Sequence, residues 1–481
     1  MIAVFENLFV SYLGRRYPYF DEDFYLTANA DVAKSAIDPL IHYHRYGRVE
    51  GRQPAKNVVS DYSASSNRML SFFTGAWKNS NYELLGDFGE LDPARKTVLV
   101  VLHEGTRTGA PIIGYNLVVG LVEKYNVITL VLQDGPIAYA CRQAGAVVMA
   151  TTRRCRNPKT VAKLIETICQ SANLEFAIVN SIESRVALFD LNARGIPNVC
   201  LVHEFASYIL PKSEFEAALL LAGETIFPAA IVRQNAQDVF PQFQDRDFPV
   251  IPQGLCLLPA EIGDDEHDRE VETIAQVRAR MGVDTLRPDT IVIIAVAAFG
   301  FRKGPDLFVQ CAARMMRSNP ELDCHFVWVG TGYHPESDGQ HSAFVADQIL
   351  REKLSDKIRF AGEIKNMGAV YEAADILLLT SRLDPLPCVA IEAIYADIPI
   401  VCFDQTTGIA DFFSDNDLAD ECVAGYLDVE DMAAKATALA RSEERRQSVS
   451  NTARKATLLD FNMVEYVQRI EEQALRIANK E

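Results

Sequence analysis

From Lys96 onward, short apolar runs alternate with segments of helical spacing, and this alternation restricts the fold more than any other feature. Runs such as KTVLVVLHE, NVITLVLQ and PNVCLVHE indicate buried strands, and each has a helical pattern beside it. Strands that alternate with helices form a parallel sheet covered on both faces. The alternation stops at an acidic, helical stretch, residues 259–285, and then restarts. The sequence therefore predicts an α/β protein with two doubly wound domains in tandem.

The domain organisation follows from where this pattern begins, stops and restarts. The predicted parts, in chain order, are a helical N-terminal segment (1–60), a polar linker (61–95), a first (96–260) and a second (261–460) Rossmann-like domain, and a C-terminal helix (461–481) that packs back toward the first domain. Two such sheets that face each other would form a cleft, and clefts between domains commonly bind ligands.

The formal net charge of −18 argues against a general attraction to nucleic acid or to anionic lipid. The longest apolar run, residues 291–301, is too short to span a bilayer, and residues 1–20 do not have the order of charges of a signal peptide. Ten cysteines without a close pair indicate reduced thiols. We therefore expect a cytoplasmic protein with no integral membrane segment, with peripheral attachment at the inner membrane as a second possibility.

Two loops of the second domain have the residue types of a ligand site, because ligands of open α/β sheets bind beyond the carboxyl ends of the strands. In FGFRKGPD, Arg302 and Lys303 precede a helix that begins near Pro305. Two cations beside free helix N–H groups suit a phosphate, although a solvated basic loop is the alternative. In VWVGTGY, Gly330 and Gly332 either let a ligand approach the backbone or simply form a turn.

The first domain offers two comparable loops. Gly109 and Pro111 open a helix in LHEGTRTGAPIIG, again in a position that favours an anion. In LVHEFAS, His203 and Glu204 follow a strand. A histidine there can hydrogen-bond to a sugar or act as a general acid or base, and a purely structural histidine is equally compatible with the sequence.

Two acids in TSRLDPLPCVAIEA, Asp384 and Glu392, form the last candidate pair. Pro385 and Pro387 keep the chain around Asp384 out of a helix, and Pro387 suits the first turn of the helix that follows. Asp384 is therefore expected in the loop above the sheet, with Glu392 about one turn into the helix. Carboxylates accept hydrogen bonds from vicinal hydroxyls such as those of sugars and riboses. A loop acid and a solvated helix glutamate are the alternative.

Taken together, FRKGPDLFVQCA, FVWVGTG, IRFAGE, DILLLTSRLDPLPCVAIEA and GIADFF occur in an order that resembles the nucleotide-binding domain of family 4 glycosyltransferases (glycosyl transferases group 1) of the GT-B fold. Two features carry the resemblance: the spacing of the acids Asp384 and Glu392, and the lysine–glycine pair after the first strand of the second domain. HEGTRTGAPIIGYNL is similar to the glycine loop of that family's acceptor domain. The resemblance covers roughly residues 96–480.

The resemblance implies a transferase that moves a hexose-type sugar from a UDP- or GDP-linked donor to a glycan or protein acceptor, with retention and without a metal ion or other cofactor. It implies that Lys303, with Arg302, holds the diphosphate and that Glu392 binds the ribose. Asp384 would face the transferred sugar and His203 would contact it near the reacting carbon. The remaining donor-site residues would be Gly109, Gly330, Gly332 and Leu386.

Some residues depart from the family pattern. Asp384 stands where glutamate is frequent, and Ala298 stands where an arginine is usual, which puts the role of Arg302 in doubt. Asp411 replaces a glutamate in a later glycine-rich loop. A non-catalytic GT-B protein that serves as a scaffold or partner, and a nucleotide-sugar epimerase, are therefore kept as alternatives.

The N-terminal segment is expected to contain two short helices, over 21–35 and 39–46. Its pattern resembles a short repeat found beside bacterial glycosyltransferases of surface-polysaccharide pathways. Assembly of a homo-oligomer through this segment is one expectation, and a structural appendage without a partner is the other.

Overall fold

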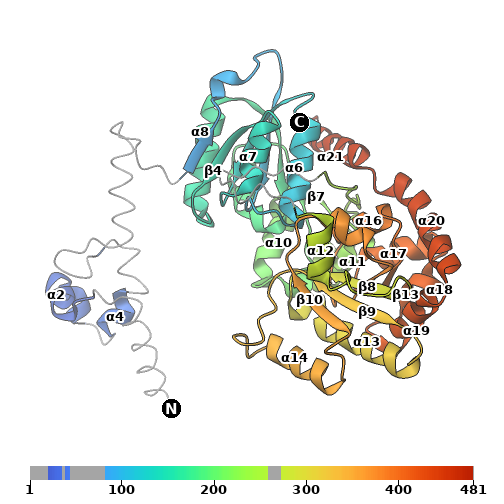
Figure 1. The fold of residues 1–481 in the computed structure, drawn as a ribbon. Helices are drawn as coiled ribbons and strands as arrows, with labels where there is room; N and C mark the ends of the chain where they lie inside the picture. Colours follow the sequence, from blue (N-terminus) through green and yellow to red (C-terminus); the bar gives the residue numbers. More distant parts are fainter. Residues whose placement is uncertain (1–19, 35–37, 44–51, 53–81, 258–271, 480–481) are drawn as a thin grey trace. The chain divides into compact units, whose positions relative to one another are not determined.

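The computed structural model describes residues 20–34, 38–43, 52, 82–257 and 272–479. The chain divides into two compact units, Met1–Asn81 and Tyr82–Glu481 (Figure 1). Several predictions lie partly outside the described residues: most of the N-terminal segment, the ends of both of its helices, most of the linker, about half of the acidic connector and the end of the C-terminal helix.

Among its described residues, the first unit has the short helices α2 (Glu22–Ala28), α3 (Ala30–Ala33) and α4 (Pro39–His42). The single helix expected over 21–35 is interrupted at Asn29, whose φ of −130° is not helical. Tyr25, Val32 and Tyr43 form the small buried cluster of this unit, with the two tyrosine rings edge to face at 5.6 Å.

The first domain of the second unit is built on a seven-stranded sheet in the order β1-β4-β3-β2-β5-β6-β7. Its strands are β1 (Tyr82–Leu85), β2 (Thr97–Leu102), β3 (Asn126–Val131), β4 (Val147–Thr151), β5 (Leu174–Asn180), β6 (Asn198–Leu201) and β7 (Glu224–Ile226). Strands β2 to β7 are parallel, and β1 pairs antiparallel with β4 at the edge. Strand β1 lies inside the range 61–95 that the sequence assigned to a linker.

Helices cover both faces of this sheet. They are α6 (Gly109–Leu121), α7 (Pro136–Gln143), α8 (Pro158–Ser171), α9 (Leu188–Ala193), α10 (Lys212–Leu221) and α11 (Ala230–Val239), with 3-10 turns at η2 (Phe88–Glu90), η3 (Ile182–Ala187), η4 (Ala206–Tyr208) and η5 (Pro241–Phe243). Leu99 and Val101 of β2 enter one buried core, whereas Val98 and Val100 enter the other. Successive residues of a strand point to opposite faces, so a continuous apolar run is needed when both faces are covered.

The second domain repeats this architecture with a six-stranded parallel sheet in the order β10-β9-β8-β11-β12-β13. Its strands are β8 (Ile291–Val296), β9 (Cys324–Val329), β10 (Ile358–Gly362), β11 (Ile376–Leu379), β12 (Ile400–Phe403) and β13 (Val423–Ala424). Its helices are α12 (Ile274–Met281), η7 (Phe301–Lys303), α13 (Pro305–Ser318), α14 (Ser342–Arg351), α15 (Met367–Glu372), α16 (Cys388–Tyr395), α17 (Gly408–Asp415), α18 (Ala419–Cys422), α19 (Val429–Ala440) and α20 (Glu443–Asp460). The predicted pair of doubly wound parallel-sheet domains is confirmed.

The last helix, α21 (Met463–Ala478), lies against α6 and strands β5 to β7 of the first domain (Figure 1). Its apolar face, which includes Tyr466, Ile470 and Ala474, is part of the first domain's core. The chain thus passes between the domains twice, and the two passages touch: the Leu255 N–H donates to the Phe461 carbonyl at 3.0 Å.

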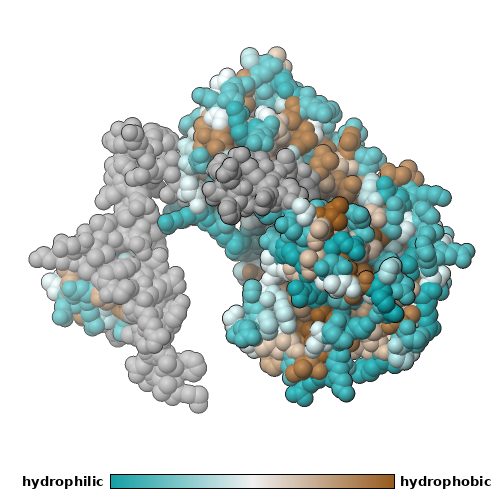
Figure 2. Space-filling view, viewed as in Figure 1, coloured by the Kyte–Doolittle hydropathy of each residue, from teal (hydrophilic) through white to brown (hydrophobic). Residues whose placement is uncertain are grey.

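On the face drawn in Figure 2, hydrophilic residues cover most of the described surface, with apolar residues scattered among them. Of the helices that the structure describes, none is both long and apolar enough to pass through a membrane.

Candidate functional site

A cavity of about 610 Å³ lies between the two domains, at the carboxyl ends of strands from both sheets. This volume is in the range of small-molecule sites. The predicted site residues that line it are His203, Asp384, Gly109, Arg302, Lys303, Gly330, Leu386 and Glu392. Gly332, the remaining predicted residue, is not among its lining residues. The structure therefore brings together residues that are up to 283 positions apart in the sequence, from Gly109 to Glu392.

The two cations of the FGFRKGPD loop meet the carboxylate of Asp384. Lys303 Nζ lies 2.5 Å from Asp384 Oδ2, and Arg302 Nη1 lies 3.4 Å from Oδ1. Helix α13 begins at Pro305, with Gly304 before it, so its first N–H groups follow directly after the cations. The resemblance implied separate roles for the lysine and the aspartate, whereas in the structure the two side chains form one ion pair.

Asp384 is only 6% exposed and is fixed on several sides. Its backbone N–H donates to the Thr406 carbonyl at 2.8 Å, and the Ser381 hydroxyl donates to its Oδ2 at 3.1 Å. Burial alone would raise the pKa of Asp384, but the charges of Lys303 and Arg302 outweigh it and leave the pKa below the ordinary aspartate value. The carboxylate is therefore ionised at neutral pH.

Arg382, which sequence analysis did not single out, ties the two loops together. Its guanidinium binds both carboxylate oxygens of Asp306, at 2.9 and 2.7 Å, and its backbone N–H donates to the Arg302 carbonyl at 2.7 Å. The guanidinium also lies 3.9 Å from the centre of the Phe301 ring. A bidentate pair of this kind fixes orientation as well as charge, so Arg382 holds the loop of Arg302 and Lys303 in place.

Glu392 lies on α16 and faces the same cavity. Its Oε2 accepts a hydrogen bond of 2.8 Å from the Tyr371 hydroxyl. Burial raises the pKa of Glu392 above the ordinary value, and the hydrogen bond from Tyr371 only partly opposes this. A carboxylate with so little solvation is well suited to accept hydrogen bonds from a ligand that enters the cavity.

On the first-domain side, the orientation of His203 is fixed by Asn180. The Asn180 Nδ2 donates to the Ala110 carbonyl at 2.7 Å, so its Oδ1 faces the His203 Nε2 at 2.8 Å. This arrangement assigns the proton to Nε2 and leaves Nδ1 of the imidazole as a hydrogen-bond acceptor. Burial, with a smaller contribution from His103, lowers the pKa of His203 to about 3, so the ring is neutral at physiological pH.

Two neighbours of His203 complete this side. The Glu204 carboxylate accepts hydrogen bonds from the backbone N–H of His203 at 2.9 Å and from the Ser181 hydroxyl at 2.6 Å. Burial raises the pKa of Glu204. His103, at the end of β2, is a second histidine that lines the cavity and that sequence analysis missed. The only signal for it is its place directly after an apolar strand. Across the cavity, the Tyr208 ring lies 5.6 Å from the Arg302 guanidinium.

The glycines of the predicted site differ in what they do. Gly330 has a φ of +146°, and a Cβ there would lie 1.9 Å from the Ala297 carbonyl oxygen, so only glycine fits between β8 and β9. Gly109 is the first residue of α6, and a Cβ there would meet no atom within 4 Å. The side of the cavity at Gly109 is therefore open.

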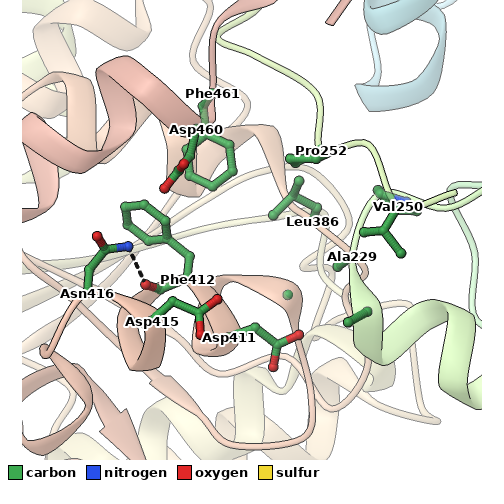
Figure 3. A pocket seen from close by; sticks show the side chains of 13 residues that line it. Ala229, Val250, Pro252, Leu386, Asp411, Phe412, Asp415, Asn416, Asp460 and Phe461 are labelled. Atoms are coloured by element: carbon green, nitrogen blue, oxygen red, sulfur yellow. Dashed lines mark hydrogen bonds between the residues drawn. The ribbon is translucent and has the colours of Figure 1, made fainter. Parts of the chain in front are cut away.

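A second cavity, of about 460 Å³, lies beside the first and shares Leu386 with it (Figure 3). Its apolar lining includes Phe412, Phe461 and Val250, and Asp411 also lines it. Burial raises the pKa of Asp411 above the ordinary aspartate value. The residue that replaces the family's glutamate thus lies outside the main cavity.

Within the described residues, no group of three or more His, Cys, Asp or Glu side chains is arranged to hold a metal ion.

Solved structures of other proteins identify the fold of this chain. Anabaena Alr3699/HepE in complex with UDP and glucose superposes with a TM-score of 0.60 at 17% identity, over 78% of this chain and 98% of that one. Sucrose-phosphate synthase from Thermosynechococcus elongatus gives 0.60 at 14% identity, over 80% and 100%. At such identities these likenesses show the fold, which is GT-B: two Rossmann-like domains that face a cleft.

The sequence comparison identifies the second domain more closely. Residues 280–456 match the family model described as glycosyl transferases group 1. An N-acetylgalactosaminyltransferase of Campylobacter jejuni that acts on an undecaprenol-linked glycan is 26% identical over 39% of this chain and 47% of its own length. D-inositol 3-phosphate glycosyltransferase of Kribbella flavida is 30% identical over 26% and 30%. The matches thus span less than half of these curated relatives.

Proposed function

We propose that this chain is a glycosyltransferase that moves a hexose-type sugar from a UDP- or GDP-linked donor to a glycan or protein acceptor. The observation that carries the proposal is the meeting of Arg302, Lys303, Glu392 and His203 around one interdomain cavity. The match of residues 280–456 to glycosyl transferases group 1 supports it. A UDP-linked donor is favoured by the likeness to Alr3699/HepE, which was solved with UDP and glucose.

In this proposal the second domain binds the nucleotide. Lys303 and Arg302 contact the diphosphate together with the first N–H groups of α13, which suit an anion. Glu392 accepts hydrogen bonds from the ribose hydroxyls. Because Lys303 already contacts Asp384, the diphosphate and this carboxylate share one cation. Arg382 acts through the loop and not on the ligand.

The first domain is proposed to contact the sugar. His203 is neutral, and its free Nδ1 accepts a hydrogen bond from a sugar hydroxyl, so it positions the sugar and carries no charge into the reaction. Asp384 faces the transferred sugar from the other side. The proposed reaction retains the anomeric configuration and uses no metal ion. Negative charge that develops on the leaving diphosphate is stabilised by the two cations and the helix N–H groups.

All ten cysteines are free thiols, which supports a cytoplasmic location for this reaction.

The test begins with isothermal titration of the full chain with UDP, GDP and their hexose conjugates. Transfer is then followed by mass spectrometry with glycan and peptide acceptors. Nucleotide binding with transfer to an acceptor is the expected result. Binding without transfer or hydrolysis would favour a scaffold, interconversion of the free nucleotide sugar would favour an epimerase, and failure to bind either nucleotide would refute the proposal.

A further inference from the structure

Arg302 is the more exposed of the two cations at the cavity. Its side chain is 42% exposed, against 19% for Lys303. Its Nη1 donates to the Leu383 carbonyl at 2.6 Å and lies 3.4 Å from Asp384 Oδ1. Among the described residues, no acceptor is hydrogen-bonded to its Nε or Nη2. These two nitrogens are therefore available to a ligand in the cavity.

A long, exposed arginine side chain has many rotamers, and fixing one of them costs conformational entropy. This cost weakens ligand binding unless the free protein already holds the side chain in place. The contacts within the second domain reach Arg302 at Nη1 alone, so the guanidinium can still turn about that end. A further contact is needed to keep Nε and Nη2 directed toward a ligand.

This further contact comes from the first domain. The centre of the Tyr208 ring lies 5.6 Å from Cζ of Arg302, within the range in which a cation is attracted to the face of an aromatic ring. Both residues line the cavity. Burial raises the pKa of Tyr208, so its phenol is protonated at physiological pH and the attraction is to a neutral ring.

Tyr208 is itself well anchored. It is the last residue of η4, whose Ala206 and Ser207 carbonyls both accept from Lys212 Nζ at 2.5 Å. The Ser207 N–H donates to Asn235 Oδ1 of α11 at 3.1 Å. Tyr208 also packs against one of the two cores of the first domain. Its ring therefore offers the arginine a fixed surface.

We propose that Tyr208 is a positioning residue for the diphosphate of the donor, because its ring keeps the Arg302 guanidinium directed into the cavity. The identity of the ligand rests on the proposed function. Tyr208 acts through Arg302 and does not touch the reacting atoms. The inference gives a role to Arg302, which the family pattern left in doubt because Ala298 stands where an arginine is usual. Since ring and guanidinium belong to different domains, a ligand that uses Arg302 also favours the arrangement of the domains in which they meet.

Titration of the full chain with UDP, GDP and inorganic diphosphate tests the proposal. Tyr208→Leu removes the ring, and we expect it to weaken binding about three- to tenfold. Tyr208→Phe keeps the ring and should restore the affinity to within about twofold of wild type. Tyr139→Leu is the matched control, since Tyr139 is a half-buried tyrosine of the same domain that does not line the cavity. An unchanged affinity in Tyr208→Leu, or an equal loss in Tyr208→Phe, would overturn the proposal.

A double-mutant cycle shows whether Tyr208 acts through Arg302. In a chain that carries Arg302→Ala, the addition of Tyr208→Leu should cause no further loss of affinity, because the guanidinium that the ring holds is gone. A ring that only supports the fold would weaken binding equally with and without Arg302, and that result would contradict the positioning role.

The same titrations separate this inference from the proposed function. A wild type that binds inorganic diphosphate in a Tyr208-dependent way, but binds neither UDP nor GDP, would refute the proposed function and support the positioning role. A wild type that binds UDP as tightly as Tyr208→Leu does would refute the positioning role alone. Failure to bind any of the three would refute both.

Discussion

The two domains have the same architecture, but their buried carboxylates at the cleft differ in their partners and in the direction of their pKa shifts. In the second domain, the buried carboxylate of Asp384 is paired with Lys303 and Arg302, and its pKa is lowered. In the first domain, the hydrogen bonds that Glu204 accepts among the described residues come from the Ser181 hydroxyl and from the backbone N–H groups of Ile182 and His203, and burial raises its pKa. The neighbouring His203 is kept neutral.

This difference shows that the strand-end loops, and not the sheets, decide what each domain can bind. The second domain presents charge that suits a diphosphate. The first domain presents the neutral imidazole of His203, which suits a hydroxyl, with Arg107 also lining this side of the cavity. Three measurements test this difference between the domains: the affinity for a nucleotide, the free energy of unfolding and the melting temperature.

The largest effect is expected for Lys303→Ala on nucleotide binding. Loss of a charge-assisted contact costs about 1.5–3 kcal/mol, or roughly tenfold to more than a hundredfold in affinity. Isothermal titration with UDP and GDP measures it. His203→Ala, on the first-domain side, should change the affinity for the free nucleotide less than about threefold. In the proposed function His203 contacts the transferred sugar, which the free nucleotide lacks, so no charged contact is lost.

Lys357→Ala is the matched control, since Lys357 pairs with Asp323 in the same domain and does not line the cavity. Equal losses in Lys303→Ala and His203→Ala would mean that the division of roles between the domains is wrong.

The second effect concerns stability. Asp384→Asn removes the charge that holds Lys303 and Arg302, and we expect the free energy of unfolding to fall by about 1–3 kcal/mol. Because the pKa of Asp384 is lowered on folding, its contribution is present above the ordinary aspartate pKa and is lost as the pH falls through the folded value. Urea unfolding at pH 7 and at acidic pH checks both points. A wild-type stability at pH 7 in this variant would show that the ion pair is not stabilising.

The smallest effect has the opposite sign. The pKa of Glu204 is raised on folding, so its ionised form costs stability above the ordinary glutamate pKa, and that cost disappears as the pH falls below this value. Glu204→Gln should therefore raise the melting temperature at pH 7, by less than Asp384→Asn lowers it, and the gain should vanish in acid. A lower melting temperature at pH 7 would mean that the Glu204 carboxylate stabilises the fold, as the Asp384 carboxylate is expected to do. The two domains would then not differ in this respect.

The sequence predicted the sheets because their strands are buried on both faces and read as continuous apolar runs. It did not predict β1, whose four residues YELL are at best half-buried and form no such run. The helix interruption at Asn29 was missed for a similar reason, since local spacing is helical on both sides of it.

For the candidate site, the sequence placed Lys303 and Asp384 in loops that follow strands and Glu392 in the helix after Pro387, where the structure has them. It could not show that Lys303 and Asp384 form a pair, because that contact joins loops separated by 81 positions. Arg382, Tyr371 and His103 were missed on the same ground. Each acquires its role from a neighbour that only the folded chain supplies.

The contact between the two passages of chain has a mechanical consequence. A Cβ on Gly254 would lie 2.1 Å from the backbone nitrogen of Met463, so only the absence of a side chain lets the two passages between the domains touch. Rotation of one lobe relative to the other can keep the Leu255–Phe461 hydrogen bond only if the axis runs close to this point. A bulkier residue at position 254 would force the two passages apart and disturb this hydrogen bond.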